Sequence, residues 1–381
     1  MKPIPYGRQF IDKTDEDAVM AALQSDFMTQ GPRIAEFEKE FAEYVGSNYA
    51  VAVSNGTAAL HLSAMAIDVQ PGDKVITTPI TFSASANCVR YCGGEVVFCD
   101  IDSETFTLSI EKLTEILKAS PKGTYKAIIP VDFAGYPCDM EAIYKLAKEY
   151  EFKIIEDACH APGGYFIDSI NEKQKCGSGN FSDLTVFSFH PVKHIACGEG
   201  GMITTNNESL YKKLLLLRTH GITKDPDSLI ENHGGWYYEM QELGYNYRLT
   251  DMQAALGISQ LAKLDWSVAR RIEIAEKYDE AFKGTKVKIP KRASNIKHAF
   301  HLYVIQVDDR LGLYNHLKQH QIFAQVHYVP VHTMPYYKKI KTYSLPIAES
   351  YYSRCLSIPM FPTLTAEEQN FVIEKVLEFC K

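Results

Sequence analysis

The sequence lacks the features that mark several classes of protein. No stretch holds eighteen or more uninterrupted apolar residues, so no membrane-spanning helix is expected. The first residues contain no apolar segment of the kind that a secretion signal needs, which favours a cytoplasmic protein. Positive charge is not in excess, because the formal net charge is −7 and the pI is about 6.0. Binding to nucleic acid or to an anionic membrane is therefore not expected.

Cysteine is present, but not in a pattern that carries a structure or a metal. The nine cysteines are an odd number, and no CxxC pair occurs, so neither a disulfide framework nor a metal site is predicted. Cys88, Cys92 and Cys99 are interpreted as small buried apolar residues. Cys159 and Cys197 lie close to the site proposed below, but neither has a base beside it that would make it a nucleophile.

The chain contains what a globular protein with a large core requires. Hydrophobic residues make up 46% and charged residues 23% of the 381 positions, and no low-complexity tract interrupts them. A chain of this length exceeds the usual size of one hydrophobic core. We therefore expect one large domain and a smaller second one.

Short apolar runs alternate with helical patterns through the first two thirds of the chain, which is typical of an α/β fold with a mostly parallel sheet. The predicted helices are residues 34–46, 56–67, 140–151 and 211–221. The seven predicted strands are residues 49–55, 73–79, 95–101, 126–133, 152–157, 185–190 and 201–206.

The pattern changes after a helical run over residues 249–282. Short strands are predicted at 298–308 and 322–330, and helices follow them. We place the domain boundary in the helical run, so that residues 1–262 form the large domain and residues 263–381 form a smaller C-terminal α/β domain.

Ligands of open α/β sheets bind outside the carboxyl ends of the strands, and three such ends carry polar residues. The first is the sequence Ser54-Asn55-Gly56-Thr57, where a strand is followed by a helix. Glycine allows close approach of an anion, the start of the helix offers free N–H groups, and Thr57 adds a hydroxyl. This combination suggests a phosphate site, although the same residues are also ordinary helix caps.

The second strand end leads from a buried apolar strand into Asp157. A carboxylate at that depth needs donors or a cationic partner, such as a protonated pyridine nitrogen. The alternative is that Asp157 caps the following turn. His160 follows shortly after, either as a structural histidine or as a donor beside a bound ring.

The third strand end carries Ser188, His190 and Lys193 in a connection that closes with the glycine-rich sequence GEGG. Most lysines lie on solvated surfaces, but this one lies between two predicted buried strands. A desolvated lysine has a lowered pKa and can form a Schiff base, which requires an anion site and an electron sink nearby. The first two strand ends offer both.

Five motifs in this order, spread over nearly the whole chain, resemble the DegT/DnrJ/EryC1/StrS sugar aminotransferases, which are pyridoxal 5'-phosphate (PLP) enzymes of fold type I. They are SNGTAAL, TTPITFSASAN, IIEDACHA, FSFHPVKHIACGEGGMITTN and LGYNYRLTDMQAALGISQL. Related enzymes that catalyse dehydration have a histidine in place of the cofactor lysine. Lys193 therefore favours transamination.

The resemblance implies a role for each matching residue. Lys193 would form the internal aldimine with PLP, and Asp157 would pair with the pyridine nitrogen. Phe82 would stack on the ring. The remaining cofactor contacts implied are Gly56, Thr57 and Ser188 at the phosphate, His160 at the phenolic oxygen, and Asn246 from a neighbouring subunit, which implies a homodimer with a shared active site.

Within the family, the sequence resembles the aminotransferases of pseudaminic acid biosynthesis in the motifs LRTHGITKD, WYYEMQELGYNYRLTD and AQVHYVPVH. These enzymes transfer an amino group from glutamate to C4 of a UDP-linked 4-keto-6-deoxy-N-acetylhexosamine in a ping-pong reaction. The substrate contacts that this implies, besides Gly56, Ser188 and Asn246, are Tyr6, Asp26, Phe27, Met28, Thr29, His190, Gln325, Val326, His327 and Tyr328.

Two alternatives remain at this stage. A sister enzyme acting on a dTDP-linked sugar, or on a UDP-linked sugar of the D series, would keep the same fold and the same lysine. A regulatory or binding protein on the same fold would be expected to lack Lys193 or Asp157, and both are present.

Overall fold

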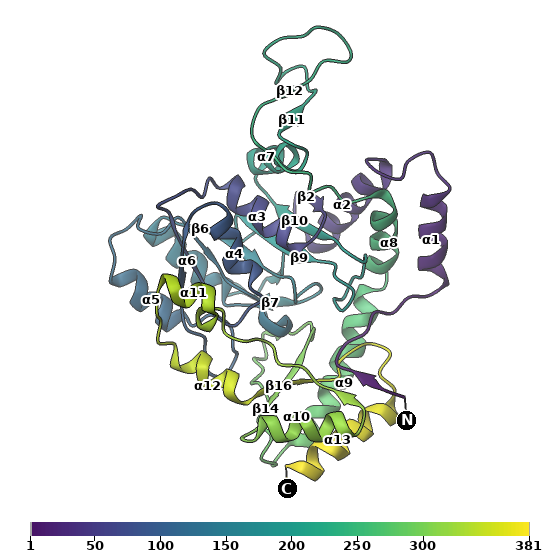
Figure 1. Cartoon of the computed structure of the whole chain (residues 1–381), viewed down its shortest axis with the longest axis vertical. Helices are drawn as coiled ribbons and strands as arrows, with labels where there is room; N and C mark the ends of the chain where they lie inside the picture. Colours follow the sequence, from purple (N-terminus) through teal and green to yellow (C-terminus); the bar gives the residue numbers. More distant parts are fainter. Residues whose placement is uncertain (1, 381) are drawn as a thin grey trace.

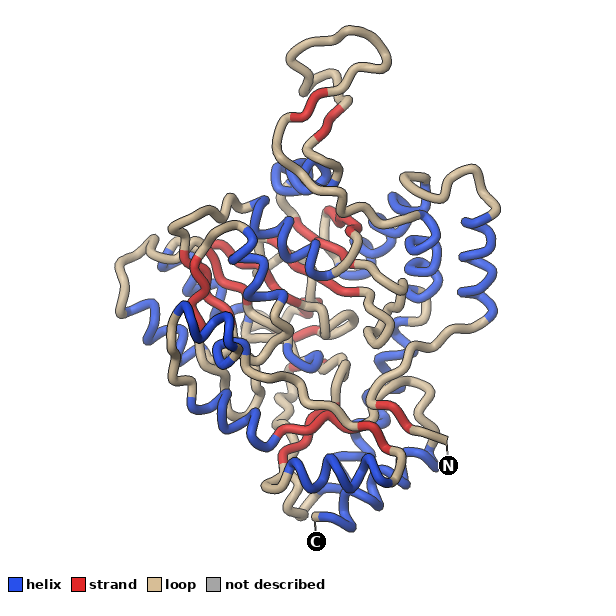
Figure 2. Tube along the Cα trace, in the orientation of Figure 1, coloured by secondary structure: helices blue, strands red, loops and turns tan. Residues whose placement is uncertain are grey.

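The computed structural model describes residues 2–380 and contains a central sheet of seven strands covered by helices on both faces (Figures 1 and 2). All seven strands predicted from the sequence are present. In spatial order they are β2 (Tyr49–Val53), β10 (Gly201–Thr205), β9 (Leu184–Ser188), β6 (Lys153–Asp157), β5 (Ala127–Ile129), β3 (Lys74–Thr77) and β4 (Glu95–Phe98).

The sheet is mostly parallel, as predicted. Strands β9, β6, β5, β3 and β4 pair in parallel with their neighbours, and only β10 runs against both of its partners, β2 and β9. Connections between parallel strands must cross over one face of the sheet, which explains why helices separate most of these strands in the sequence. The carboxyl ends of β2, β6 and β9 consequently meet at one edge of the sheet.

Alternate residues of each strand face opposite sides of the sheet, and a different set of helices covers each side. Val51 and Ile155 pack in the cluster formed with helices α3 (Gly56–Ala66), α4 (Ala84–Tyr91) and α7 (Glu208–Arg218). The opposite face packs against α2 (Pro32–Val45), α5 (Ile110–Lys118), α6 (Met140–Tyr150) and α8 (Asp251–Leu261). Neighbouring residues at a strand end therefore point to different layers.

Helix α2 shows how the local sequence fixes an element. It begins with Pro32 in its first turn, where the missing N–H is not needed. It ends at Gly46, whose φ of +85° is left-handed and costs glycine little. The predicted end of this helix is confirmed.

The C-terminal elements form a second cluster around α9 (Leu264–Phe282). Two pairs of strands contribute to it, β14 (Tyr303–Gln306) with β16 (Cys355–Ile358), and β1 (Ile4–Pro5) with β15 (Ile322–Phe323). Ile4 is buried in this cluster, so the start of the chain lies against its C-terminal elements. The remaining helices are α1 (Lys13–Leu23), α10 (Arg310–Gln319), α11 (Pro335–Ile340), α12 (Pro346–Arg354) and α13 (Ala366–Phe379). The boundary at residue 263 stays a prediction.

Three predictions for this part of the chain need correction. The helical run over residues 249–282 is two helices, α8 and α9, with a break next to Lys263. Lys263 Nζ binds Asp12 and Asp15 at 2.6 and 2.7 Å. These contacts with the N-terminal segment cannot be predicted from a periodic pattern of apolar residues. The predicted strand 298–308 is shorter, because the N–H groups of residues 299 and 302 bind carbonyl oxygens of residues 135 and 134 instead of a neighbouring strand. In the predicted strand 322–330, only residues 322–323 form a strand.

A long β-hairpin, which the sequence did not predict, projects from the body of the molecule after α7 (Figure 1). Its strands are β11 (Ile222–Thr223) and β12 (Glu239–Met240). Its exposed apolar side chains include Ile230 at 86% and Trp236 at 75% of their full accessibility. No helix within residues 2–380 is long and apolar enough to cross a membrane.

Candidate active site

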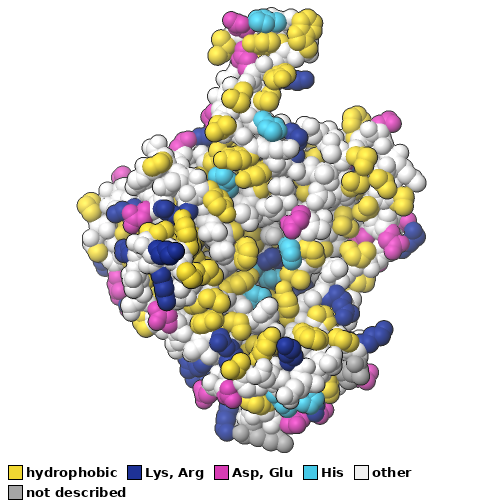
Figure 3. Space-filling model, viewed as in Figure 1, with side chains coloured by type: hydrophobic (Ala, Val, Ile, Leu, Met, Phe, Trp, Pro, Cys, Tyr) yellow, Lys and Arg dark blue, Asp and Glu magenta, His cyan; other side chains and the backbone are white. Residues whose placement is uncertain are grey.

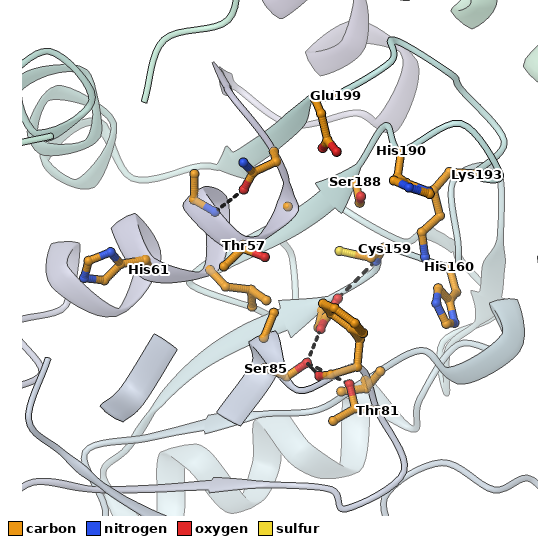
Figure 4. Close-up of a pocket in the computed structure, with 18 of the residues that line it drawn as sticks. Thr57, His61, Thr81, Ser85, Cys159, His160, Ser188, His190, Lys193 and Glu199 are labelled. Carbon is orange, nitrogen blue, oxygen red and sulfur yellow. Dashed lines mark hydrogen bonds between the residues drawn. The ribbon is translucent and has the colours of Figure 1, made fainter. Parts of the chain in front are cut away.

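A cavity of about 940 Å³ opens at the carboxyl ends of β2, β6 and β9, below α3. Figure 3 shows histidine side chains gathered in a hollow on this face of the molecule, and Figure 4 shows the residues of the cavity from several elements pointing toward one another. The predicted site residues that line it are Tyr6, Gly56, Thr57, Phe82, Asp157, His160, Ser188, His190, Lys193, His327 and Tyr328.

The start of α3 offers an anion site at one end of this central cavity. Asn55 caps the helix, because its side-chain oxygen accepts from the N–H of Ala58 at 2.8 Å. The N–H groups of Gly56 and Thr57 lie in the first helical turn, where no carbonyl of the helix can accept them. A Cβ atom on Gly56 would lie 2.9 Å from the Cβ of Ser188, so glycine allows the end of β9 to approach the helix. The structure therefore shows the helix cap, and the phosphate site stays a prediction that the free donors beside the cap support.

Asp157 ends β6 on the face covered by α3 and is 4% exposed. Its Oδ2 accepts from Ser85 Oγ at 2.6 Å, and its Oδ1 accepts from the N–H of Cys159 at 3.2 Å. Ser85 in turn lies 2.7 Å from the hydroxyl of Thr81 (Figure 4). These donors hold the carboxylate at the inner end of the cavity. With them in place, an ionised Asp157 can face a cationic ring nitrogen.

Lys193 extends into the cavity from the connection between β9 and β10 (Figure 4). Its N–H donates to the carbonyl oxygen of His190 at 2.8 Å, which closes the turn that carries it. Burial lowers the pKa of Lys193 to about 8, although the nearby Cys159 and Asp157 act in the opposite direction. An amine with that pKa is partly unprotonated near neutral pH, as Schiff-base chemistry requires.

His160 lies beyond Lys193 and is held in one tautomer. Its Nδ1 accepts from the N–H of Ala134 at 3.2 Å, so Nε2 carries the proton and donates to the hydroxyl of Tyr328, also at 3.2 Å. Burial, with the charge of Lys193 as a smaller cause, keeps the pKa of His160 well below its usual 6.5. Neutral His160 can therefore donate a hydrogen bond without adding positive charge.

Residues 9–377 match the DegT/DnrJ/EryC1/StrS aminotransferase family. The chain belongs to this family. It is 40% identical to the spore coat polysaccharide biosynthesis protein SpsC of Bacillus subtilis, over 99% of this chain and 97% of that protein. It is 37% identical to the UDP-4-amino-4,6-dideoxy-N-acetyl-beta-L-altrosamine transaminase of Campylobacter jejuni, over 97% of this chain and 95% of that protein.

Solved structures extend the similarity to the whole fold. Helicobacter pylori PseC, an aminotransferase involved in the biosynthesis of pseudaminic acid, is 30% identical with a TM-score of 0.89, over 100% of this chain and 99% of that one. The PLP form of a Streptococcus pneumoniae protein assigned as a sugar aminotransferase is 28% identical with a TM-score of 0.87, over 98% and 97%. The protein is thus a PLP-dependent sugar aminotransferase.

The central cavity of this aminotransferase fits PLP at both ends of the cofactor. The start of α3 matches the phosphate dianion, since free N–H groups and the helix dipole favour negative charge. Asp157 lies buried at the other side, where a protonated ring nitrogen would compensate its charge. Lys193 lines the same cavity. Phe82 is 60% exposed and borders the opening.

Other predicted site residues of the aminotransferase lie outside the central cavity of a single chain. Asn246 is exposed and forms an isolated antiparallel bridge with Thr219. The other residues outside it are Asp26, Phe27, Met28, Thr29, Gln325 and Val326, of which the first five are exposed. Their predicted roles are tested neither by the cavity nor by the comparisons.

Sequence analysis missed several residues that the fold brings to the site. Ser85 and Thr81 lie within the motif TTPITFSASAN. Their hydroxyl groups were therefore a local signal for donors to a buried carboxylate. His301 approaches Lys193 from the C-terminal part of the chain, 108 residues away in sequence. Tyr247 and His61, whose side chains are 3.2 Å apart, line the far end of the cavity. No local pattern connects these residues to the motifs.

Cys159 also lines the cavity, but its environment opposes a role as a nucleophile. Burial and the neighbouring Asp157 raise the pKa of the Cys159 thiol well above 9. The reactive form of cysteine is the thiolate, which is therefore scarce near neutral pH. This agrees with the interpretation of Cys159 as a residue without a catalytic role.

Asp132 and Glu156 form a buried carboxyl pair on the face of β6 opposite to Asp157. With Cys176 they are the one group within residues 2–380 whose potential metal-binding atoms lie within 4.8 Å of one another. Thr185 Oγ1 donates to Glu156 at 2.7 Å, and the N–H of Cys138 donates to Asp132 at 2.8 Å. Burial first, and then the charge of Glu156, raise the pKa of Asp132 well above 3.8, which favours the protonated form of this carboxyl group.

Proposed function

We propose that this aminotransferase transfers the amino group of glutamate to C4 of a UDP-linked 4-keto-6-deoxy-N-acetylhexosamine, a reaction of pseudaminic acid biosynthesis. The observation that carries the proposal is the similarity to the Campylobacter jejuni transaminase, whose named sugar is a UDP-linked N-acetylaltrosamine, along 97% of this chain. The fold of Helicobacter pylori PseC, matched over the whole chain, supports the same substrate class.

When bound, PLP supplies an aldehyde carbon that forms an imine with an amine and a ring that accepts electrons. Lys193 would provide the amine that holds it and would move a proton at Nζ in each half of a ping-pong reaction. The pKa of about 8 suits both tasks, since the amine must release and take up a proton near neutral pH. Asp157 would keep the ring nitrogen protonated. Gly56, Thr57 and Ser188 would bind the phosphate.

Tyr6, His327 and Tyr328 would contact the sugar from the opposite wall of the cavity. The rings of Tyr6 and His327 are 5.2 Å apart, and His327 Nδ1 lies 2.8 Å from Ser357 Oγ. Burial lowers the pKa of His327 to about 3, so it is neutral at working pH. A neutral polar wall can bind sugar hydroxyl groups without repelling the amine of Lys193.

The anionic groups of the substrates point to a site shared between two chains. A UDP-sugar and glutamate both carry negative charge, yet no arginine is among the cavity-lining residues of the described chain. The projecting hairpin exposes a cluster of apolar side chains that a second copy of the chain could cover. We therefore propose a homodimer in which Asn246 reaches the phosphate site of the partner subunit. Cytoplasmic location stays a prediction from the sequence.

A panel of nucleotide-linked 4-keto-sugars tests the substrate. The purified holoenzyme is incubated with glutamate and with UDP-linked sugars of the L and D series or with dTDP-linked sugars, and the aminated product is detected by mass spectrometry. We expect turnover of the UDP-linked L sugar at the highest kcat/KM. Turnover confined to a dTDP-linked or D-series sugar would refute the pseudaminic substrate and leave the aminotransferase assignment intact.

A further inference from the structure

His301 lies against the amine of Lys193, in a position that the reaction described above does not use. Its Nε2 is 3.5 Å from Lys193 Nζ, at the outer limit of hydrogen-bonding distance. The side chain is 4% exposed and lines the central cavity. Nδ1 is buried and has no hydrogen-bond partner in the described part of the chain, so Nε2 is the nitrogen available for an interaction.

The backbone that carries His301 is held from several directions. Buried Arg271 donates from Nη1 to the carbonyl oxygens of Phe300 and His301, at 3.0 and 3.3 Å. His194 Nε2 lies 2.8 Å from the carbonyl oxygen of Ala299. Phe300 has a φ of +49°, a left-handed conformation that a residue with a side chain keeps only where its surroundings impose it. The imidazole therefore occupies a fixed position beside the lysine.

We propose that His301 is a positioning residue that accepts a hydrogen bond from the Lys193 amine and holds it beside the cofactor whenever the lysine is not bonded to it. The proposal rests on the assignment of Lys193 as the cofactor lysine. In a ping-pong reaction this amine must leave and return in each half-reaction. The lysine side chain is long and flexible, so a fixed acceptor shortens the search for the reactive geometry.

The protonation state of His301 suits this role. Burial first, and then the charge of Lys193, keep the pKa of His301 well below 6.5, so the ring is neutral and can accept a hydrogen bond. The other titratable or charged groups that influence Lys193 or His301 are Asp157, Cys159, His160, His194 and Arg271. Asp157 is bound by Ser85 and Cys159, and His160 by Ala134 and Tyr328, so neither replaces His301 as the partner of the amine.

The test measures the Lys193 amine in protein freed of cofactor. Reductive methylation with formaldehyde is followed over pH, and modification of the Lys193 peptide is quantified by mass spectrometry. In the unsubstituted protein we expect a midpoint near the pKa of about 8. His301→Leu removes the acceptor that stabilises the charged amine, so the midpoint should fall by about one pH unit. His301→Gln, which keeps an acceptor, should restore most of the shift.

His298→Gln is the matched control. His298 lies in the same segment, but its ring contacts Tyr136 and Phe300 instead of the cavity. Its Nδ1 accepts from the N–H of Phe300 at 2.8 Å, and glutamine keeps an acceptor for that N–H group. This variant should leave the midpoint unchanged even if its Tm falls. A general loosening of the segment would expose Lys193 and raise the midpoint, which is opposite to the expected direction.

Turnover supplies a second measurement on the loaded enzyme. His301→Leu should lower kcat by about tenfold with little change in KM, because the proposed contact is with the lysine and not with substrate. Unchanged pH profiles in His301→Leu would overturn the positioning role. A separate experiment tests whether Lys193 is the cofactor lysine. If it is not, Lys193→Ala protein will still form an imine with PLP that borohydride reduces.

Discussion

The floor of the central cavity and its rim are built in different ways. The floor, comprising Asp157, His160, Lys193 and His301, consists of side chains that their own chain fixes through hydrogen bonds or backbone contacts. The rim is the name given to residues 26–29, residues 245–248 and the projecting hairpin, segments that lie mostly outside the cavity and are largely exposed in one chain. The contrast supports the proposal that one chain contains the groups for the chemistry and that a second chain completes the site.

The largest effect should come from the floor. Lys193→Ala removes the amine that forms the imine with PLP and moves the proton, so turnover should fall by roughly 10⁴-fold or more. The protonated imine of Lys193 with PLP absorbs at about 400 nm, and this absorbance band should also be lost. Absorption spectra with and without glutamate, together with borohydride reduction and peptide mapping, measure both effects.

A substitution at the rim should act across subunits. Asn246→Ala should weaken PLP binding by roughly 10- to 100-fold, the effect of losing one hydrogen bond to a charged group. If the site is shared, exchange of Asn246→Ala with Lys193→Ala subunits should create mixed dimers with one complete site. Equal mixing should then recover about a quarter of the normal activity, since half of the dimers are mixed and each has one of two sites intact.

Subunit exchange must be shown independently, for example by native mass spectrometry of the mixture. Mixed dimers without recovered activity would place Asn246 in its own chain's site and remove the contrast between floor and rim.

A smaller effect is expected beneath the floor, at the buried Asp132 and Glu156 pair. The pKa of Asp132 is higher in the folded state than in the unfolded state, where it is near 3.8. Asp132 therefore stabilises the fold below the unfolded pKa, and this stabilisation is lost as the pH rises through the folded-state pKa. Asp132→Asn keeps the size of the side chain and cannot ionise. The difference in Tm between the variant and the unsubstituted enzyme should therefore increase by a few degrees from pH 5 to pH 8. This corresponds to about 1–2 kcal/mol in the free energy of unfolding, and scanning calorimetry measures it. A constant Tm difference would contradict the raised pKa of Asp132.

The smallest effect is expected for Cys159→Ala. The raised pKa of this thiol leaves little thiolate, so kcat should change by less than about threefold and its pH dependence should not change. A large loss of kcat with an unchanged Tm would show that the floor contains a further chemical group.

Much of the fold and of the floor could be predicted because the information is local. The seven strands appear as short apolar runs, and the end of α2 at Gly46 follows from the conformational freedom of glycine. Asp157 and Lys193 stand out because charged residues follow buried strands. The break between α8 and α9 could not be predicted in this way, since it coincides with the binding of Lys263 to two aspartates near the N-terminus.

By itself, the sequence determined the layers, the strand ends at which the site lies, and the residue types that suit PLP, because periodicity and turn residues act over a few positions. Only the tertiary structure decided that His301 meets Lys193 and that Ser85 holds Asp157. It also decided that Asp132 lies beside Glu156, whose charge helps to raise the pKa of Asp132. Each of these contacts joins segments that are distant in the sequence and that the order of the strands in the sheet brings together, and no local pattern specifies that order.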